Sequence, residues 1–346
     1  MYWDNLYTSC TLCPRNCGVD RLAGQRGFCG ETADLRIAVA NIHRGEEPPL
    51  TGLGGSGTIF ITGCTLGCAF CQNWQVSHSG MGRVVKTDEF AAICLALQRA
   101  GAENINIVTG SHAIPAIITG ITQARKEGLQ IPILWNSSSY ESAQVLLNAE
   151  PYIDVFLPDL KTLDNTFAGR YFNAADYPEA ATKAILAMIS MKELRYGPCR
   201  KALEAAHTGA PVAADWPLIL ESGVVIRHLV LPDRLEDTRA VLQWFAEHAQ
   251  GKALISVMTQ YTPVKSPKNR FAKELPDRYV GEREFEIIQR WFEEFDIEDG
   301  FYQELVPDDA WLPDFMKTNP FSSELSVPIW HWEHGFIPND TPPLSG

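Results

Sequence analysis

The sequence lacks the features that mark a membrane-spanning or exported protein. No stretch approaches the roughly 18 uninterrupted apolar residues that a membrane-spanning helix needs. The opening residues MYWDNLYTSC contain neither the basic nor the apolar region of a signal peptide. We therefore expect a cytoplasmic protein that has no membrane partner. With 346 residues, of which 45% are hydrophobic and 21% charged, the composition is that of an ordinary globular protein.

Positive charge is also scarce. The 29 Lys and Arg residues face 42 Asp and Glu residues, which gives a formal net charge of -13. This sign argues against a protein that clamps a nucleic-acid backbone, although one local basic patch would overturn that argument. No phosphate-loop, dinucleotide or G-x-S-x-G signature occurs. The glycines of GLGGSG at 52–57 precede an expected strand, so they predict a turn and not a phosphate cradle.

What the sequence does contain is nine cysteines. An odd number without an export signal does not describe a disulfide framework, and seven of the nine fall into two tightly spaced groups. Cys94 stands apart in an expected helix that begins at Thr87 as N-cap, and we interpret it as a buried apolar residue. Cys199 lies beside a proline in an expected loop and has no predicted role. The spacing of the other seven cysteines indicates that they bind metal.

One group is the C-x3-C-x2-C run of Cys64, Cys68 and Cys71, directly after the apolar strand expected over 58–62. Three thiolates on one loop can hold three corners of an iron–sulfur cube and leave the fourth iron without a protein ligand. An open iron is a site for chemistry. The alternative is a structural zinc that takes its fourth ligand from elsewhere.

The other group is Cys10, Cys13, Cys17 and Cys29, with spacing C-x2-C-x3-C-x11-C. Four thiolates can satisfy one zinc ion or one iron–sulfur cluster completely. The spacing does not separate zinc from iron, because thiolates serve both metals. A third reading is reactive thiols, activated by Arg15 or Arg21 nearby.

Apolar strands alternate with helices along the middle of the chain, which predicts an α/β fold with a parallel sheet buried on both faces. The expected strands after 58–62 are 103–110, 131–137, 152–161, 223–232 and 253–261. Six such units are too few to close an eight-stranded barrel. The expected organisation is a Cys-rich segment at 1–50, a barrel at 51–261 with an insertion near 192–222, and a C-terminal extension at 262–346 whose amphipathic helix packs on the barrel.

The cysteine run with Phe70 before its last cysteine resembles the cluster motif of the radical S-adenosylmethionine (SAM) superfamily. The resemblance implies an open, six-unit partial TIM-like barrel, a 4Fe-4S cluster and S-adenosyl-L-methionine as cofactors, and oxidoreductase chemistry. In that superfamily the open iron chelates SAM, and an electron from the cluster cleaves SAM into methionine and a 5'-deoxyadenosyl radical. The radical then takes hydrogen from a substrate.

A closer resemblance is to the PflX-like subgroup, relatives of pyruvate formate-lyase activating enzyme. It covers nearly the whole chain, through CTLCPRNCGVDR, GSGTIFITGCTLGCAFCQNWQVS, LWNSSSYES, PDLK, RHLVLP and SVMTQYTP. The insertion near 192–222 fits it least well. The resemblance does not supply a substrate.

The resemblance also implies site residues at the ends of the barrel strands. Asp159 and Lys161 resemble the Asp-x-Lys of glycyl-radical-enzyme activases, and we expect them, with the three cysteines, to act in catalysis. Where the superfamily has a Gly-Gly-Glu-Pro-like motif, this sequence has Thr-Gly-Ser-His at 109–112 and lacks the carboxylate. The expected cofactor contacts are Phe70, Asn73, Thr109, Gly110, Asn136, Ser137, Asp159, Lys161, Arg227 and Gln260. Arg227 and His228 are adjacent in a strand, so at most one faces inward.

Two kinds of radical chemistry follow from these expectations. The first is hydrogen abstraction from a protein, in the manner of a glycyl-radical-enzyme activase, with an electron donor such as flavodoxin or ferredoxin. The second is modification of a small metabolite or a protein side chain, which is favoured if the terminal segments cover the barrel opening. RNA modification ranks lower because of the net charge. A non-catalytic iron–sulfur or zinc protein is the alternative of another class.

Overall fold

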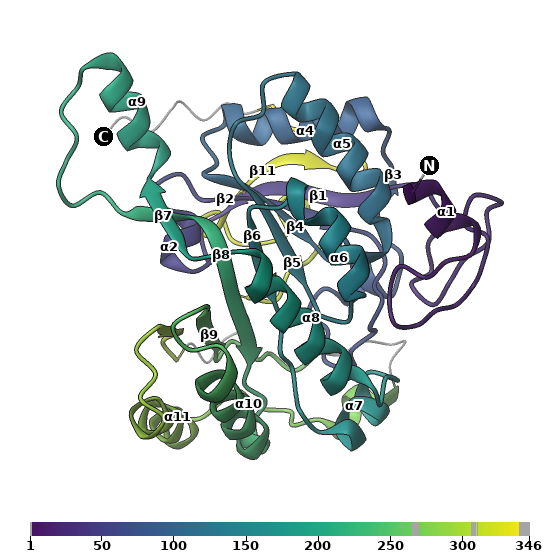
Figure 1. Cartoon of the computed structure of the whole chain (residues 1–346), viewed down its shortest axis with the longest axis vertical. Helices are drawn as coiled ribbons and strands as arrows, with labels where there is room; N and C mark the ends of the chain where they lie inside the picture. Colours follow the sequence, from purple (N-terminus) through teal and green to yellow (C-terminus); the bar gives the residue numbers. More distant parts are fainter. Residues whose placement is uncertain (1, 265–269, 306–308, 310, 339–346) are drawn as a thin grey trace.

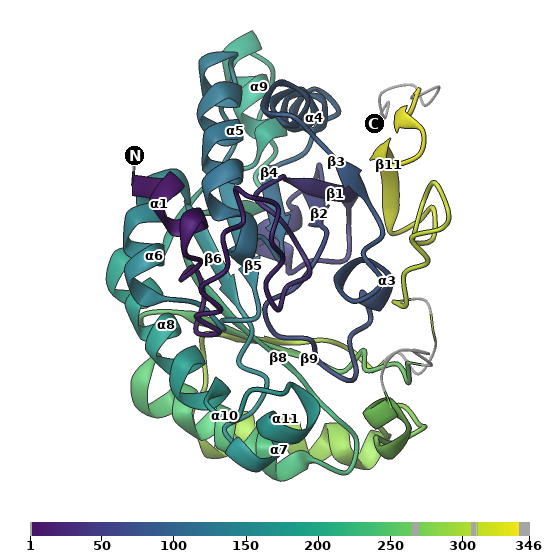
Figure 2. The same ribbon diagram turned by 90° about the vertical axis from the view of Figure 1, so that its right-hand side faces the viewer.

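The computed structural model describes residues 2–264, 270–305, 309 and 311–338. Its centre is a curved sheet in which seven strands run parallel, in the spatial order β10-β9-β8-β6-β5-β4-β2 (Figures 1 and 2). The strands are β2 (Ser56–Ile61), β4 (Asn104–Val108), β5 (Ile133–Ser137), β6 (Val155–Pro158), β8 (Leu218–Leu229), β9 (Leu254–Met258) and β10 (Gly300–Tyr302). The fold is therefore a mixed α/β fold with an open, parallel-rich sheet, consistent with a partial TIM-like barrel.

Antiparallel strands extend this sheet beyond β2. Strand β1 (Arg36–His43) pairs with β2 on one side and with β11 (Ser326–His331) on the other. Strand β11 continues into β12 (Gly335–Phe336), and β3 (Arg83–Val84) pairs with the start of β1. Residues near both ends of the chain thus meet at one edge of the sheet, and the sheet order of the described residues ends at β10 and β12 without closing.

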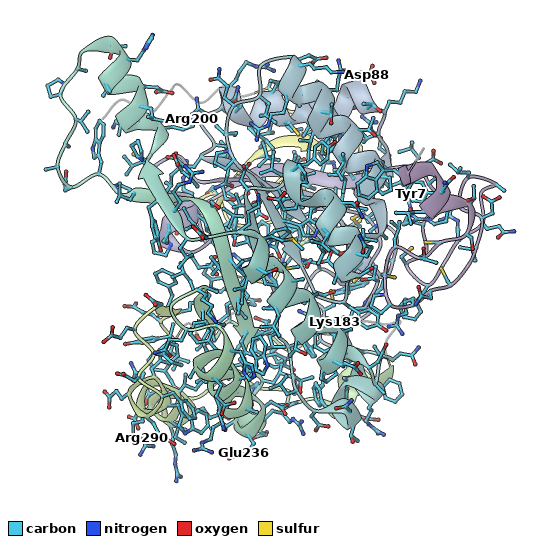
Figure 3. All side chains as sticks on the ribbon, viewed as in Figure 1. Tyr7, Asp88, Lys183, Arg200, Glu236 and Arg290 are labelled. Carbon is cyan, nitrogen blue, oxygen red and sulfur yellow. The ribbon has the colours of Figure 1, made fainter. Side chains whose placement is uncertain are left out.

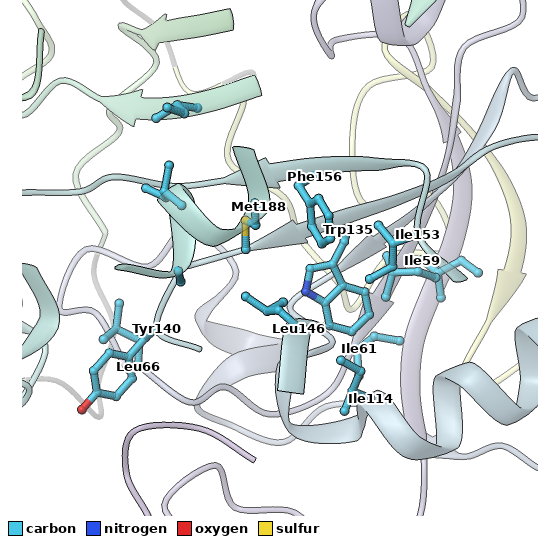
Figure 4. Close-up of a cluster of buried hydrophobic side chains, with 14 of the residues drawn as sticks. Ile59, Ile61, Leu66, Ile114, Trp135, Tyr140, Leu146, Ile153, Phe156 and Met188 are labelled. Carbon is cyan, nitrogen blue, oxygen red and sulfur yellow. The ribbon is translucent and has the colours of Figure 1, made fainter. Parts of the chain in front are cut away.

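Helices pack along the outer side of the parallel strands (Figure 2). They are α4 (Thr87–Arg99), α5 (Ile114–Lys126), α6 (Ala143–Ala149), α8 (Tyr177–Met191) and α10 (Leu235–His248). Every residue of β2, β4 and β6 is buried, and their apolar residues therefore pack on both faces of the sheet. Strands β2 and β4 also bury polar side chains, and the Ser56 hydroxyl donates to Asn104 at 2.7 Å. Figure 4 shows Trp135 and Phe156 of adjacent strands packed with Leu146 of α6 and Met188 of α8.

The N-terminal segment begins with α1 (Tyr2–Thr8) and continues as a loop up to β1. A short helix, α2 (Pro48–Thr51), and a turn then lead into β2. Gly52, Gly54 and Gly55 lie in this turn, as the sequence predicts, whereas Gly57 already belongs to β2. Figure 3 labels Tyr7 in this segment and Arg200 on the distant α9. Tyr7 is only 4% exposed, so the segment is anchored on the rest of the protein.

The expected insertion forms a strand, β7 (Arg195–Pro198), and a helix, α9 (Arg200–Thr208), and β7 pairs antiparallel with the first half of β8. Strand β8 therefore begins at Leu218, five residues before the expected 223. Cys199 is the N-cap residue of α9 and is fully buried beside Ala202 and Ile219. It lies in the short connection between β7 and α9, directly after Pro198, as the sequence predicts.

The described part of the C-terminal extension contains a 3-10 helix (Arg270–Glu274), α11 (Glu282–Glu294), β10, β11 and β12. Helix α11 buries Ile288 and Phe292 and packs against α10. The remaining short helices are α3 (Trp74–Ser77) and α7 (Asn165–Tyr171), with 3-10 turns at Ser111–Ala113 and Glu150–Tyr152. Within the described residues, no helix has the length and apolar character needed to cross a membrane.

The expected strands and helices are present, with boundaries that differ by a few residues. One local prediction is wrong: Thr87 is the first residue of α4, Lys86 is its N-cap, and no side chain caps the helix. Cys94 is fully buried on α4, as predicted for a small apolar residue. The structure also adds β1, which packs seven of its eight residues into the interior.

Candidate active site

The loop between β2 and α3 carries Cys64, Cys68 and Cys71 to one cavity. The cavity has a volume of about 480 Å³, and all three cysteines line it. Cys68 is buried and the other two are partly exposed. The loop is held by its own hydrogen bonds, because the Leu66 N–H donates to Cys64 Sγ at 3.4 Å and the Cys71 N–H donates to the Cys68 carbonyl at 3.2 Å. The expected grouping of the three thiols on one loop is therefore confirmed as geometry.

Gly63 allows the chain to enter this loop. Its φ of 91° lies in the left-handed region, and a Cβ there would lie 2.8 Å from the carbonyl oxygen of Cys29. The loop is also tied to α7, because the Ala69 N–H donates to the Tyr171 carbonyl at 2.8 Å. Phe70 is buried and packs edge-on against Phe172, with 5.7 Å between ring centroids. The cysteine loop is thus held between the N-terminal segment, at Cys29, and the end of α7.

The three thiols fit a cluster better than a single ion. Among the described residues, the one trio of His, Cys, Asp and Glu ligand atoms that all lie within 4.8 Å of one another is His331, Glu333 and His334. Four sulfurs around one zinc ion would lie about 3.8 Å apart, given Zn–S bonds of about 2.3 Å. Thiolates that bind separate irons lie further apart, so three sulfurs that are not all within 4.8 Å of one another are compatible with an iron–sulfur cube.

Burial controls the protonation of these thiols. It raises the pKa of Cys71 to about 11, with a further increase from Cys64, and it raises the pKa of Cys68 as well. The Cys71 thiol and the Ser77 hydroxyl are 3.2 Å apart. A metal that binds Cys68 and Cys71 must therefore displace their protons.

The ends of the neighbouring strands line the same cavity. Thr109 follows β4, Asn136 and Ser137 end β5, and Asn73 precedes α3. The Thr109 N–H donates to the Asn136 carbonyl at 2.8 Å, which ties two strand ends together. Gly110 is the exception: it is buried and does not line the cavity, and a Cβ there would meet the rings and methyls of Trp135 and Ile117.

Asp159 and Lys161 stand at the end of β6 and both face the cavity. Lys161 Nζ lies 2.6 Å from Asp159 Oδ2, and both side chains are mostly buried. Burial opposes the charge of Lys161, but Asp159 and then Cys68 raise its pKa above the ordinary value. Tyr177 supports the pair, because its hydroxyl donates to the Asp159 carbonyl and accepts from the Lys161 N–H. A cation is therefore fixed beside a cluster cysteine.

Arg227 faces the cavity from β8, and the adjacent His228 points away, as the alternation of a strand requires. His228 is buried between the Leu160 carbonyl and the Thr238 hydroxyl, and burial lowers its pKa to about 4. Arg227 forms ion pairs with Glu46 and Glu47. Burial would raise the pKa of Glu47, but Arg227 reverses this and lowers it.

The sequence interpretation missed these two glutamates. They follow β1 and precede two prolines, where acidic residues normally lie in solvent, and their partner is far along the chain. The Asn106 side-chain amide also donates to Glu46, at 3.0 Å. The only signal in the sequence was Arg227, which lies in an expected buried strand. A buried cation in a strand needs an anionic partner.

A further missed residue is Glu141, which lies just after β5. It is buried, and its carboxylate accepts from Trp135 Nε1 at 2.9 Å and from the Ser137 hydroxyl at 2.5 Å. Burial raises its pKa, although these hydrogen bonds oppose the increase. The sequence pattern placed Glu141 in a helix, whereas α6 begins at Ala143. Glu141 positions Ser137 at the cavity.

The C-terminal extension forms one wall of the cavity. Its lining residues are Phe301, Tyr302, Gln303, Trp311, Pro313 and Phe321. Gln260, expected as a cofactor contact, lines the cavity and accepts a hydrogen bond from Gln303 at 3.0 Å. The Gln260 carbonyl in turn accepts from Gln72 on the cysteine loop, at 2.8 Å. This wall therefore connects to the loop that carries the thiols.

The N-terminal cysteines do not line the cavity. Cys10 and Cys13 are buried, Cys29 is partly exposed and Cys17 is exposed, and all four are free thiols. Arg15, between two of them, donates to the carbonyls of Thr65 and Leu66 on the cysteine loop, at 3.0 Å each. The two cysteine groups are separate but adjacent.

Comparison with known families agrees with this geometry. Residues 58–192 match the family model described as the radical SAM superfamily. This stretch is a radical SAM domain. It includes the three cysteines that line the cavity and the Asp159–Lys161 pair. The radical SAM domain begins within β2 and ends after α8, so Arg227 and the C-terminal wall lie beyond it.

The chain is also similar to individual proteins. It is 26% identical over 280 residues to an uncharacterized protein of Methanocaldococcus jannaschii, covering 79% of this chain and 70% of that one. Among solved structures it is similar to Streptococcus suis SuiB bound to S-adenosylmethionine, with 14% identity, a TM-score of 0.46 and 69% of this chain covered. A radical SAM methyltransferase from Sphaerobacter thermophilus gives 12% identity, a TM-score of 0.46 and 72% coverage. The match spans about half of SuiB, 48%, and 66% of the methyltransferase.

Proposed function

We propose that the protein is a radical SAM enzyme that cleaves S-adenosylmethionine reductively and uses the resulting radical to abstract hydrogen from a substrate. The observation that carries this proposal is that three cysteines and a buried ion pair face one cavity inside a radical SAM domain. When bound, a 4Fe-4S cluster and SAM supply an electron and a 5'-deoxyadenosyl radical. The chain supplies the ligands, the charges and the enclosure.

Each group of cavity residues has a proposed part. Cys64, Cys68 and Cys71 hold the cluster, and Phe70 packs behind it. Lys161, held by Asp159, presents a cation to the SAM carboxylate. Backbone and small polar groups at the ends of β4 and β5 suit the ribose and methionine portions. These contact groups are Asn73, Thr109, Asn136 and Ser137, with Gln260 and Arg227 on the far side of the cavity. For Gly110 a direct contact is not proposed, because it does not line the cavity.

For the substrate, the cavity wall favours a small molecule or a single inserted side chain. Aromatic residues of the C-terminal extension, Tyr302, Trp311 and Phe321 among them, line the cavity together with the three cysteines. Such an apolar wall with a few polar groups beside it is typical of sites that bind small molecules. The wall therefore supports hydrogen abstraction from a compact group.

A glycyl-radical-enzyme activase of the PflX-like kind is the second candidate. It is favoured by the Asp159–Lys161 pair, which has the Asp-x-Lys order that resembles those activases, and by its position beside Cys68. An activase acts on a protein backbone, so its substrate would enter as an extended segment. The aromatic wall argues against that entry.

The reaction needs a one-electron donor, and we propose a flavodoxin or ferredoxin. We also propose that the N-terminal cysteines bind a second metal centre. Nine free thiols fit a reducing compartment, so we place the enzyme in the cytoplasm.

The decisive experiment is anaerobic reconstitution with iron and sulfide, followed by dithionite reduction in the presence of SAM and assay of 5'-deoxyadenosine. We expect 5'-deoxyadenosine from the wild type and none from Cys68→Ala. Cys94→Ala is the matched control, since Cys94 is a buried thiol on α4 outside the cavity. A wild-type protein with a loaded cluster that yields no 5'-deoxyadenosine, even with whole-cell extract added as a substrate source, contradicts the proposal.

A second experiment separates the two substrate classes. Extract from cells grown in deuterated water is divided into a small-molecule fraction and a protein fraction, and each is added to the reaction. Deuterium in 5'-deoxyadenosine identifies the fraction that donates hydrogen. Deuterium transferred from the small-molecule fraction supports a small-molecule substrate. Deuterium transferred from the protein fraction alone supports the activase.

A further inference from the structure

The four N-terminal cysteines are gathered in one compact loop outside the cavity. Hydrogen bonds from the Cys10 N–H to the Val19 carbonyl (3.0 Å) and from the Gly18 N–H to the Cys10 carbonyl (3.1 Å) close the first half of the loop. The second half folds back on it, because a Cβ at Gly27 would lie 2.7 Å from Cys17 Sγ. The four cysteines therefore lie within a single fold of the chain.

The second half of the loop packs against sulfurs of the first half. Arg21 Nη1 lies 4.0 Å from Cys10 Sγ, and a Cβ at Gly27 would lie 2.7 Å from Cys17 Sγ, so both a side chain and the backbone approach the sulfurs. Cys10 and Cys13 are 5% and 8% exposed, so half of the set is shielded from solvent. Four thiols in one loop are the ligand number of one closed metal centre.

A buried cation points to an anionic occupant. Arg21 is 1% exposed, and its Nη1 lies 4.0 Å from Cys10 Sγ. Its guanidinium donates to the carbonyls of Thr32 and His112 and lies over the Tyr7 ring, and its Nε has no partner. Within the part of the chain that the structure describes, it forms no ion pair with a carboxylate. Burial raises the pKa of the Glu31 carboxylate, and both Arg36, its direct ion-pair partner, and the nearby Arg21 oppose this increase. Metal-bound thiolates next to Arg21 would supply further negative charge.

The sulfurs are not arranged as a preformed zinc site. Such a site would place sulfurs about 3.8 Å apart, given Zn–S bonds of about 2.3 Å. No three of the four sulfurs lie within 4.8 Å of one another, since the single such trio among the described residues consists of His331, Glu333 and His334. Zinc would therefore have to draw the thiols together, whereas thiolates that bind separate irons need not lie so close.

We infer that Cys10, Cys13, Cys17 and Cys29 bind a second 4Fe-4S cluster, with Arg21 as its buried counter-charge. All four irons then have protein ligands, so this cluster does not bind SAM. The inference rests on the second metal centre of the proposed function and names its kind, and it is independent of SAM binding because these cysteines do not line the cavity.

The second cluster would stand directly beside the first. A Cβ at Gly63, which precedes Cys64, would lie 2.8 Å from the carbonyl of Cys29, so the two cysteine-bearing backbones are in contact. The ring of Phe28 covers Gly67 of the cavity loop at 3.5 Å. An iron–sulfur centre at this position can exchange single electrons with its neighbour, whereas zinc has no redox chemistry.

The test removes the first cluster and counts what remains. The variant Cys64→Ala/Cys68→Ala/Cys71→Ala is reconstituted anaerobically with iron and sulfide in the presence of zinc, and iron, sulfide and zinc are measured per chain. We expect about four irons and four sulfides in this variant and about eight of each in the wild type. The reduced variant should give an electron paramagnetic resonance signal that SAM does not alter.

One zinc per chain without iron would overturn the inference, and so would a folded variant that binds no metal. Adding Cys13→Ser and Cys17→Ser to the triple variant should abolish the remaining iron, whereas adding Cys199→Ala, another buried thiol, should retain it. In the same background Arg21→Gln should make the cluster harder to reduce, because a nearby positive charge is removed, and an unchanged midpoint potential would contradict the role of Arg21. Failure of SAM cleavage leaves these metal counts unaffected, so the two proposals fail separately.

Discussion

Lys161 Nζ lies 2.6 Å from Asp159 Oδ2, two residues away, and the pair faces the cavity beside Cys68. The short distance between these two side chains depends on the backbone just after β6. The strand ends at Pro158, and the Tyr177 hydroxyl then hydrogen-bonds to both the Asp159 carbonyl and the Lys161 N–H. A lysine with four flexible bonds is thereby fixed in one place. The cation that we assign to the SAM carboxylate depends on this pair.

Asp159→Ala should slow reductive SAM cleavage about 10- to 100-fold without loss of the cluster, because Lys161 loses the partner that orients it. The measurement is the rate of 5'-deoxyadenosine formation together with iron content. Glu294→Gln is the control, since it breaks the half-exposed pair with Arg239 on the outer helices. Unchanged cleavage kinetics in Asp159→Ala would remove Asp159 from the proposed site.

Arg15→Lys should loosen the cysteine loop. Arg15 donates to the carbonyls of Thr65 and Leu66 at 3.0 Å each and to that of Phe172, also at 3.0 Å, and one ammonium group cannot reach all three. We expect a loss of about 2–3 kcal/mol in the free energy of unfolding. We also expect faster release of iron from the cavity cluster to a chelator.

The control for this variant is Arg26→Lys, because Arg26 donates to the Gly30 carbonyl from an exposed position and contacts no part of the cavity loop. Equal rates of iron release in Arg15→Lys and Arg26→Lys would show that Arg15 does not support the loop.

Much of the barrel could be predicted from local pattern. Strand β6 is apolar at every position and β2 and β4 are rich in Ile, Val and Phe because both faces are buried, and such segments are recognisable without knowing the partner strands. The cysteine spacing likewise reports a local property, since one short loop carries all three thiols. The inward position of Arg227 and the outward position of His228 follow from the alternation of a strand.

Other parts depend on contacts between distant residues. Strand β1 pairs with β11, so that Val39 lies opposite His331, and nothing near Val39 in the sequence indicates that pairing. Glu46 and Glu47 look like exposed loop residues until Arg227 lies between them. The aromatic wall of the cavity is equally hidden, because Trp311 and Phe321 have no periodic pattern that distinguishes them from surface residues.

Glu141→Gln should change how stability depends on pH. Burial raises the pKa of Glu141 above the unfolded value of about 4.3. Its contribution to stability is therefore complete below that unfolded pKa and is lost as the pH rises through the higher folded pKa. Glutamine cannot ionise, so the variant should lose less stability than the wild type between pH 5 and pH 8. Urea unfolding at both pH values measures this, and parallel pH profiles would contradict it.

Arg227→Met should destabilise the protein by about 3–5 kcal/mol, because Glu46 and Glu47 would remain buried without a cation. In the wild type the pKa of Glu47 is lowered, so its stabilising contribution is present above the unfolded pKa and is lost as the pH falls through the folded value. Without Arg227, burial alone acts on Glu47 and raises its pKa. The pH dependence of the Glu47 contribution to stability then reverses its sign, and the variant should lose stability as the pH rises.

Urea unfolding of Arg227→Met at pH 5 and pH 8 tests this reversal, and the double variant Arg227→Met/Glu47→Gln separates its cause. Glutamine at position 47 removes the buried charge, so the double variant should recover part of the lost stability and most of the difference between the two pH values. If the double variant is no more stable than Arg227→Met at pH 8, the loss arises from packing around the arginine stem and not from the uncompensated carboxylate.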